Sequence, residues 1–228
     1  MTKFDVAIVG AGIVGLAHAL AAARRGKSVI VLDRDAQANG ASIRNFGFVT
    51  VSGQEAGDCW QMARRARDVW AEVAAAAGIP VLQRGMIMTA RRPEAEAVIE
   101  AFLATDMGAQ CRRLTLAEAR NFVPALRSDH LSGAFYSPHE LRVESRDALP
   151  RLAAWLADVH GVTFQWSTSV TSIAAPVLET SRGPVMAEAV VVCPGDDFVS
   201  LYQDRISTYR PLRCKLQMLR IAPARPVD

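Results

Sequence analysis

A glycine-rich turn near the start of the chain limits its possible folds more than any other feature. Residues 4–35 read FDVAIVGAGIVGLAHALAAARRGKSVIVLDRD. The run FDVAIV is short, apolar and rich in β-branched residues, which predicts a buried strand. Gly10, Gly12 and Gly15 follow it with the spacing G-x-G-x-x-G, where the pattern changes to that of a helix. This order of strand, turn and helix predicts a site for a dinucleotide.

Each residue of the turn has a separate expected role. Gly10 permits the tight turn, Gly12 lets the backbone approach a pyrophosphate, and Gly15 lets the helix pack close to the strand. Ile13 and Val14, in the first helical turn, would present backbone N–H groups and the positive end of the helix dipole to the phosphates. All five positions are therefore predicted to bind the cofactor.

A second strand and an acidic residue complete the nucleotide-binding pattern. Residues 28–32 (SVIVL) are expected to form the strand, and Asp33 follows, 18 positions after Gly15. A carboxylate at this place accepts hydrogen bonds from both ribose hydroxyls and repels a 2′-phosphate. The alternative is a membrane span or a signal peptide, because Val6–Ala23 is mostly apolar. Three glycines and His18 within that run argue against both.

The composition predicts a soluble globular protein. Of the 228 residues, 50% are hydrophobic and 21% charged, and basic residues giving a net charge of +3 are scattered among acids. Nothing in this pattern supports binding to nucleic acid. The four widely separated cysteines are typical of reduced thiols in the cytoplasm, and the four histidines lack the spacing of a metal site. We therefore expect a cytoplasmic protein with no metal and no membrane partner, and its oligomeric state stays open.

The order of the predicted elements indicates two domains. Strands and helices alternate near both ends of the sequence, whereas the middle has a different character. We expect an α/β fold in which a Rossmann-like nucleotide-binding domain is interrupted by a mixed-sheet, α+β second domain. The first domain is assigned residues 1–84 and 145–204, and the second is assigned residues 85–144 and 205–228.

Local signals fix some helix ends. Thr115 and Glu118 have the spacing of a capping box, which would begin a short helix. Another helix is expected from near Asp147 to Val159, and it would tolerate Pro150 in its first turn if Asp147 were the cap.

Beyond the first 35 residues, the chain resembles the FAD-dependent oxidoreductases of the D-amino-acid oxidase, glycine oxidase and sarcosine oxidase type. Asp33 and Arg34 stand where that family places an acid and a base beside the adenosine ribose. Gly40–Gly47 (GASIRNFG) resembles the loop that passes the pyrophosphate and reaches the flavin ring. The resemblance implies that this loop binds the cofactor through Ser42, Arg44, Asn45 and Gly47.

Three later segments carry the resemblance through the chain. Leu114–Leu126 is similar to the helix-to-proline segment of the substrate domain. Ser169–Ile173 (SVTSI) resembles a strand whose first valine, here Val170, holds adenine through its backbone. Ala187–Gly195 (AEAVVVCPG) resembles a strand and turn near the dinucleotide, and many relatives have alanine where this chain has proline. The implied cofactor is FAD, with contacts from Val170, Pro194 and Gly195.

A narrower resemblance concerns the substrate. His139–Arg146 (HELRVESR), Cys193–Phe198 (CPGDDF) and Cys214–Arg220 (CKLQMLR) are similar to a subgroup associated with phosphonate catabolism. Members of that subgroup are thought to oxidise aminophosphonates or their N-methyl derivatives. An anionic phosphonate would be bound by arginine, because a guanidinium matches its oxygens bidentately.

Arg44 and Arg142 are the candidate substrate anchors, and His139 is a candidate polar contact. Two alternatives stay open. Arg142 would instead form a surface ion pair with Glu140 or Glu144, and His139 would be a solvated loop residue.

The resemblance implies an enzyme that transfers a hydride equivalent from a C–H bond beside an amine to flavin N5. The imine product would then hydrolyse. No catalytic residue is identified, because this chemistry needs no dedicated base when the amine binds unprotonated. Complete relatives continue past the position of Ile221 with further strands and a glycine-rich segment over the flavin, so the chain is expected to be C-terminally incomplete. The alternatives are a NAD-dependent dehydrogenase and a non-catalytic nucleotide-binding fragment.

Overall fold

The computed structural model describes residues 3–215, 217, 219, 221, 222 and 224. The contact pattern divides the chain into two compact units. The first contains Met1–Gly47, Val73–Pro80 and Glu144–Lys215, and the second contains Phe48–Glu72, Val81–Val143 and Leu216–Asp228. Of the Cys214–Arg220 segment, Leu216, Met218 and Arg220 lie outside the described residues.

These bounds differ from the domains expected from the sequence at three places, besides a one-residue shift at Glu144. Residues 81–84, expected in the first domain, group with the second unit, where they begin a strand of its sheet. Residues 48–72 group with the second unit, because Phe48 and Val49 pair with a strand of its sheet. Residues 205–215 group with the first unit, where Arg213 Nε donates a hydrogen bond to the carbonyl oxygen of Asp196.

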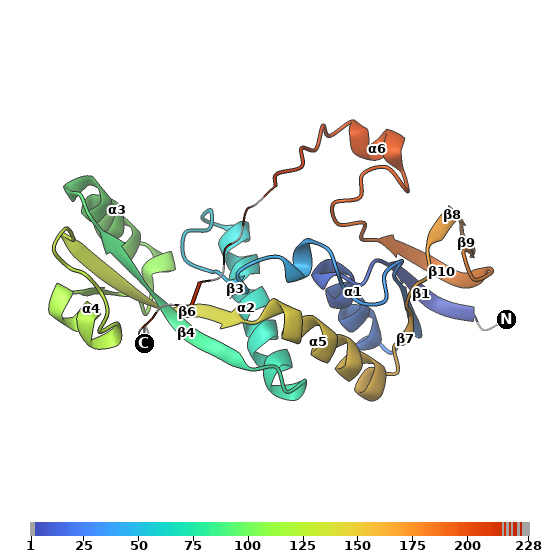
Figure 1. Cartoon of the computed structure of the whole chain (residues 1–228), viewed down its shortest axis with the longest axis horizontal. Helices are drawn as coiled ribbons and strands as arrows, with labels where there is room; N and C mark the ends of the chain where they lie inside the picture. The colour runs from blue at the N-terminus through green and yellow to red at the C-terminus, as the bar shows by residue number, and fades with distance from the viewer. Residues whose placement is uncertain (1–2, 216, 218, 220, 223, 225–228) are drawn as a thin grey trace. The chain divides into compact units, whose positions relative to one another are not determined.

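The first unit is built on a six-stranded sheet with the order β7-β2-β1-β10-β9-β8 (Figure 1). Strands β7, β2, β1 and β10 are parallel, and β9 and β8 continue the sheet in antiparallel pairing. The bounds are β1 (Lys3–Val9), β2 (Val29–Leu32), β7 (Thr163–Gln165), β8 (Val170–Ala174), β9 (Val177–Thr180) and β10 (Val185–Val192). The apolar β1 and β2 runs are buried as the sequence predicts, and with the helices they confirm an α/β fold.

Helix α1 (Ile13–Ala23) packs on this sheet, and α5 (Ser145–His160) packs against α1. Helix α1 buries Leu16 and Leu20, and α5 buries Leu152 and Leu156 on one face. A short 3-10 helix, η1 (Ala41–Ile43), and α6 (Gln203–Ser207) complete the unit.

Helix α5 begins earlier than the sequence suggested. The predicted cap, Asp147, lies inside the helix, and the N-cap position is Glu144. Ser145 is buried and its hydroxyl donates to Asn45 Oδ1 at 2.7 Å, which fixes the first helical turn two residues sooner. Pro150 therefore sits in the second turn, where it removes one backbone hydrogen bond from the helix.

The second unit contains a smaller sheet with β6 (Gly133–Val143) at its centre. Strand β4 (Val81–Ala90) pairs along one edge of β6, while β5 (Arg112–Leu114) and β3 (Phe48–Val49) pair with successive parts of the other edge. The helical elements are α2 (Asp58–Ala76), whose last turn belongs to the first unit, α3 (Pro93–Leu103), η2 (Asp106–Gly108) and α4 (Leu116–Phe122). The capping box of Thr115 and Glu118 is confirmed at the start of α4. Within the described residues, no helix combines the length and the apolar character needed to cross a membrane.

Candidate dinucleotide-binding site

The turn between β1 and α1 accepts only glycine at two positions. Gly10 has a φ of +104°, and a Cβ there would lie 2.2 Å from the carbonyl oxygen of Cys193. A Cβ on Gly15 would lie 1.8 Å from the carbonyl oxygen of Gly10. The tight turn and the close approach of helix to strand are thus both present as expected. Contact of these glycines with a cofactor stays a prediction.

Asp33 closes this turn from the end of β2. Its Oδ2 accepts a hydrogen bond from the backbone N–H of Ala11 at 2.7 Å, and its Oδ1 accepts one from the N–H of Asp35 at 2.9 Å. From the sequence, Asp33 was expected to contact only a ribose, and its hydrogen bonds within the glycine turn were missed. Each carboxylate oxygen can accept a further hydrogen bond, and Asp33 lines the cavity described below, so the ribose contact stays a prediction.

The loop after β2 is tied to the start of α1. The N–H of Ile13 donates to Ser42 Oγ at 3.0 Å. Asn45 Nδ2 donates to the carbonyl oxygen of Ser42 at 2.8 Å, and Asn45 Oδ1 accepts from the N–H of Gly47 at 2.7 Å. Asn45 thus holds the loop in shape, and its predicted contact with a cofactor stays a prediction.

A cavity of about 490 Å³ lies within the first unit, against the glycine turn. It is lined by residues that follow β1, β2 and β10 and by the segment that begins β8. A site at the carboxyl ends of parallel strands is the usual place for a ligand in such sheets. Eight of the predicted cofactor-binding residues line it, namely Gly10, Gly12, Asp33, Arg34, Ser42, Val170, Pro194 and Gly195. The other predicted positions, Ile13, Val14, Gly15, Arg44, Asn45 and Gly47, are not among the lining residues.

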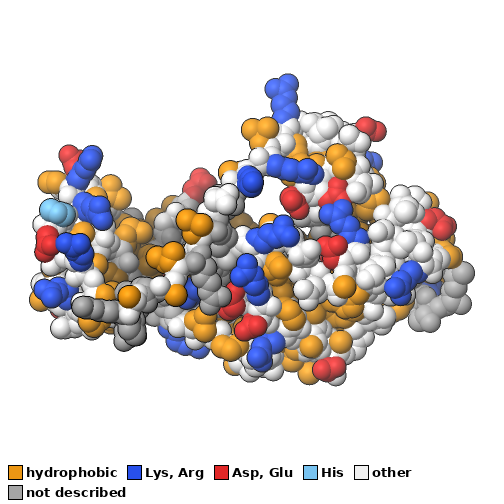
Figure 2. Space-filling model, viewed as in Figure 1, with side chains coloured by type: hydrophobic (Ala, Val, Ile, Leu, Met, Phe, Trp, Pro, Cys, Tyr) orange, Lys and Arg blue, Asp and Glu red, His pale blue; other side chains and the backbone are white. Residues whose placement is uncertain are grey.

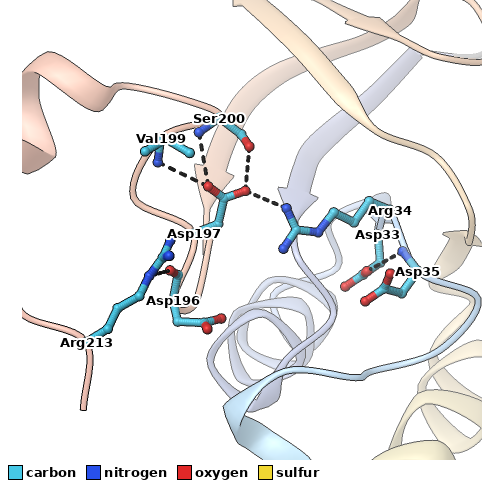
Figure 3. Close-up of polar contacts among 8 residues, drawn as sticks. All are labelled: Asp33, Arg34, Asp35, Asp196, Asp197, Val199, Ser200 and Arg213. Atoms are coloured by element: carbon cyan, nitrogen blue, oxygen red, sulfur yellow. Dashed lines mark hydrogen bonds and ion pairs between the residues drawn. The ribbon is translucent and has the colours of Figure 1, made fainter. Parts of the chain in front are cut away.

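Charged groups of both signs lie at this cavity. Figure 2 shows acidic and basic side chains gathered around the segment that carries α6. Arg34 Nη1 and Asp197 Oδ2 are 2.5 Å apart and form an ion pair (Figure 3). The Asp197 side chain is 11% exposed and that of Arg34 is 56% exposed. The pair therefore joins a partly buried acid to a base that reaches solvent.

Asp197 is also the centre of its own turn. Its Oδ2 accepts from the Ser200 hydroxyl at 2.5 Å, and its Oδ1 accepts from the N–H groups of Val199 and Ser200 at 3.1 and 3.0 Å. These hydrogen bonds, the Ser200 hydroxyl first, and the nearby Arg34 hold the pKa of Asp197 far below its ordinary value. The sequence reasoning missed this residue, although it lies in the Cys193–Phe198 segment that carried part of the resemblance.

The candidate substrate residues fall in both units. Arg44, in the first, is exposed, and its Nη2 lies 3.4 Å from Asn39 Oδ1. Arg142, in the second, is half-buried in β6, opposite Phe48 of β3. Their predicted role as substrate anchors stays a prediction.

The alternative that His139 is a solvated loop residue is wrong. His139 lies in β6 and is 3% exposed, because β6 continues through it as far as Val143. Its Nε2 lies 2.9 Å from the carbonyl oxygen of Ala109, within hydrogen-bonding distance. This contact indicates a structural role, and the predicted contact with substrate stays a prediction.

Glu140, next in β6, holds the segment that follows β3. It is 5% exposed, and its Oε1 accepts from the N–H of Ser52 at 2.7 Å and from that of Val51 at 3.4 Å. Burial raises the pKa of Glu140, but hydrogen bonds from Ser137 and Ser52 hold it below its ordinary value. The sequence considered Glu140 only as a surface partner of Arg142, and this buried role was missed. No cluster of three or more His, Cys, Asp or Glu side chains suited to a metal ion occurs in the part of the chain that the structure describes.

Comparison with known proteins gives a consistent result. Residues 5–228 match the family described as FAD dependent oxidoreductase. The chain is 27% identical over 207 residues to the glycine oxidase of Geobacillus kaustophilus (strain HTA426), which covers 85% of this chain and 55% of that protein. The chain therefore spans about half the length of this curated relative.

Solved structures show the same likeness. The crystal structure of glycine oxidase from Geobacillus kaustophilus has a TM-score of 0.71 at 26% identity, covering 85% of this chain and 55% of that one. L-proline dehydrogenase from P. horikoshii has a TM-score of 0.73 at 20% identity, covering 84% and 53%. Glycine oxidase from Bacillus cereus ATCC 14579 has a TM-score of 0.72 at 24% identity, covering 91% and 58%. The last two show a shared fold.

Proposed function

Because the chain belongs to the family of FAD-dependent oxidoreductases, we propose that it binds FAD and acts in the oxidation of a C–N bond of a small amine or amino acid. The observation that carries this proposal is the cavity bounded by the glycine turn, Asp33 and the turn after β10. The similarity to glycine oxidase supports the amine or amino-acid class of substrate.

The residues of the cavity fit the adenosine and pyrophosphate parts of FAD. Gly10 and Gly12 leave the backbone open to close approach, and the amino end of α1 offers a positive dipole to the phosphates. The Asp33 carboxylate stands at the end of β2, where it would accept from the ribose hydroxyls. Val170 would hold adenine through its backbone. Bound FAD supplies the electron acceptor for the C–H bond beside the amine nitrogen.

For the substrate, we propose an aminophosphonate or its N-methyl derivative. The support is the resemblance of His139–Arg146 and Cys193–Phe198 to the phosphonate-associated subgroup. Arg44 and Arg142 are each a candidate source of a guanidinium group for the phosphonate oxygens, which carry more negative charge than a carboxylate.

An absorbance spectrum followed by anaerobic titration tests both levels of the proposal. The purified chain should be yellow, with flavin bands that bleach when an oxidisable amine is added without oxygen. Glycine, sarcosine and N-methylated aminoethylphosphonate are added in parallel. Bleaching by the phosphonate at the lowest concentration supports the finer proposal, and bleaching by glycine or sarcosine alone refutes it. A colourless protein that takes up no added FAD would refute the proposed function as a whole.

A further inference from the structure

Arg34 and Asp197 both line the cavity, and they come from segments that follow different strands. Arg34 follows β2, whereas Asp197 follows β10, and residues on both sides of each contribute to the lining. Figure 3 shows the two side chains directed toward each other, with Asp33 and Asp35 beside Arg34. The ion pair therefore joins two separate segments that both line the cavity.

We propose that the Arg34–Asp197 ion pair is a latch that retains the adenosine half of FAD. This inference rests on the proposed function, since it assumes that FAD occupies the cavity. In that case FAD leaves fully only after residues 194–200, here called the β10 turn, move away from the end of β2.

The β10 turn is suited to act as one piece. The N–H of Asp197 donates to the carbonyl oxygen of Pro194 at 3.1 Å, and the Asp197 carboxylate binds Val199 and Ser200. Asp197 therefore organises the turn and also ties it to Arg34. Because of these hydrogen bonds, we expect residues 194–200 to move together when the Asp197 side chain moves.

The charges at the cavity strengthen the case for a latch. Among the lining residues that the structure describes, Arg34 is the sole cation beside four aspartates, at 33, 35, 196 and 197. The Asp197 side chain is partly buried, and a short, charge-assisted hydrogen bond is stronger than a neutral one. The exposure of Arg34 weakens the ion pair, because solvent screens its charge. We therefore expect the ion pair to slow the release of FAD moderately, by more than a fully exposed surface pair would.

The test is a double-mutant cycle on the release of FAD. Asp197→Asn retains one side-chain oxygen for the N–H groups of Val199 and Ser200 but removes the negative charge. Arg34→Gln removes the positive charge from an exposed side chain, and so does not depend on refolding of the β10 turn. The rate of release is followed by the rise of flavin fluorescence after dilution of the flavin-loaded chain.

Each single substitution should raise the release rate about 5- to 10-fold, as for a partly buried ion pair. The double substitution should add little to either, because both remove the same interaction. High salt should speed release from the unsubstituted chain and have less effect on Asp197→Asn, since salt screens charges. Glu188→Gln is the matched control, because it breaks the exposed Lys3–Glu188 pair on the same sheet and should leave the rate unchanged.

The outcomes separate the two proposals. Flavin that is bound but released at additive or unchanged rates in the cycle overturns the latch and leaves the proposed function standing. An unsubstituted chain that binds no flavin overturns both. A faster release in Asp197→Asn that Arg34→Gln does not reproduce also overturns the latch, because the effect then comes from the β10 turn alone.

Discussion

Substitution of Gly15 by alanine tests how tightly the dinucleotide turn is built. Two effects oppose each other at this position. Gly15 lies in the first turn of α1, and alanine in a helix is more favourable than glycine by about 1 kcal/mol. Helix propensity alone therefore predicts a more stable protein.

Packing predicts the reverse. The added Cβ would lie 1.8 Å from the carbonyl oxygen of Gly10, whereas close carbon–oxygen contacts in proteins are about 3.3 Å or longer. The backbone would have to move by roughly 1.5 Å, the difference between these distances. Gly10 has no room to yield, because its own α-carbon faces the carbonyl of Cys193. Overpacking of a rigid core costs about 1–3 kcal/mol or more. The cost is expected to be high here, because the added Cβ meets a backbone atom and not a side chain that could turn away.

We expect Gly15→Ala to lower the free energy of unfolding by about 3 kcal/mol or more, at the upper end of overpacking costs. For a chain of this size, that change lowers the Tm by about 6–12 °C. Urea unfolding followed by far-ultraviolet circular dichroism measures the free energy, and a thermal scan measures the Tm.

Gly161→Ala provides the matched control. Gly161 follows α5 with a φ of +65°, and an added Cβ would meet nothing within 4 Å. The cost is then conformational strain alone, about 1–2 kcal/mol. A Gly15→Ala protein as stable as the parent, or less damaged than Gly161→Ala, would refute the packing argument.

Three further outcomes are expected. Asp33→Ala should weaken FAD binding by about 1–3 kcal/mol, the cost of unpaired hydrogen-bonding groups, and unchanged affinity in a flavin titration would refute the ribose assignment. Glu140→Ala should destabilise the fold by about 1–3 kcal/mol, because the N–H of Ser52 loses its acceptor. The folded-state pKa of Glu140 is lowered, so its stabilising effect is complete above the unfolded pKa near 4.5 and is lost as the pH falls below that value. Urea unfolding across this pH range should show the free energies of unfolding of the parent and Glu140→Ala converging in acid. Thr115→Ala should cost about 1 kcal/mol through loss of the capping box, with Ser at the same position restoring most of it.

Local signals explain what the sequence could predict. The strand, turn and helix at the start of the chain follow from residues that are neighbours in sequence, and the geometry of Gly10 and Gly15 matches the roles inferred from their spacing. The capping box at Thr115 is likewise a relation between residues three positions apart. The contact of Gly15 with Gly10 and the capping box each join residues at most five positions apart, so spacing alone specifies them. The contact of Gly10 with the carbonyl of Cys193 is long-range, and spacing does not reveal it.

Interactions across the fold explain the errors at element ends. Asp147 is a suitable cap by residue type, but burial of Ser145 and its hydrogen bond to Asn45, 100 positions away in sequence, begin the helix earlier. His139 and Glu140 are polar, which favoured a loop, yet both are buried in β6, and turns outside the strands supply backbone partners for their side chains. A polar residue type does not reveal such partners, because they come from segments far along the chain.

The latch illustrates the same limit at the proposed site. Because β2, β1 and β10 are parallel, the residues that follow them meet at one edge of the sheet, and this brings together Arg34 and Asp197, 163 positions apart. Sequence order alone gives no reason to place β10 beside β1, and it cannot choose between two adjacent aspartates. In the structure, the Asp197 carboxylate pairs with Arg34, whereas the backbone carbonyl oxygen of Asp196 accepts a hydrogen bond from Arg213. Asp196→Asn should therefore leave the rate of FAD release closer to that of the parent chain than Asp197→Asn does, although both substitutions remove one negative charge from the same cavity.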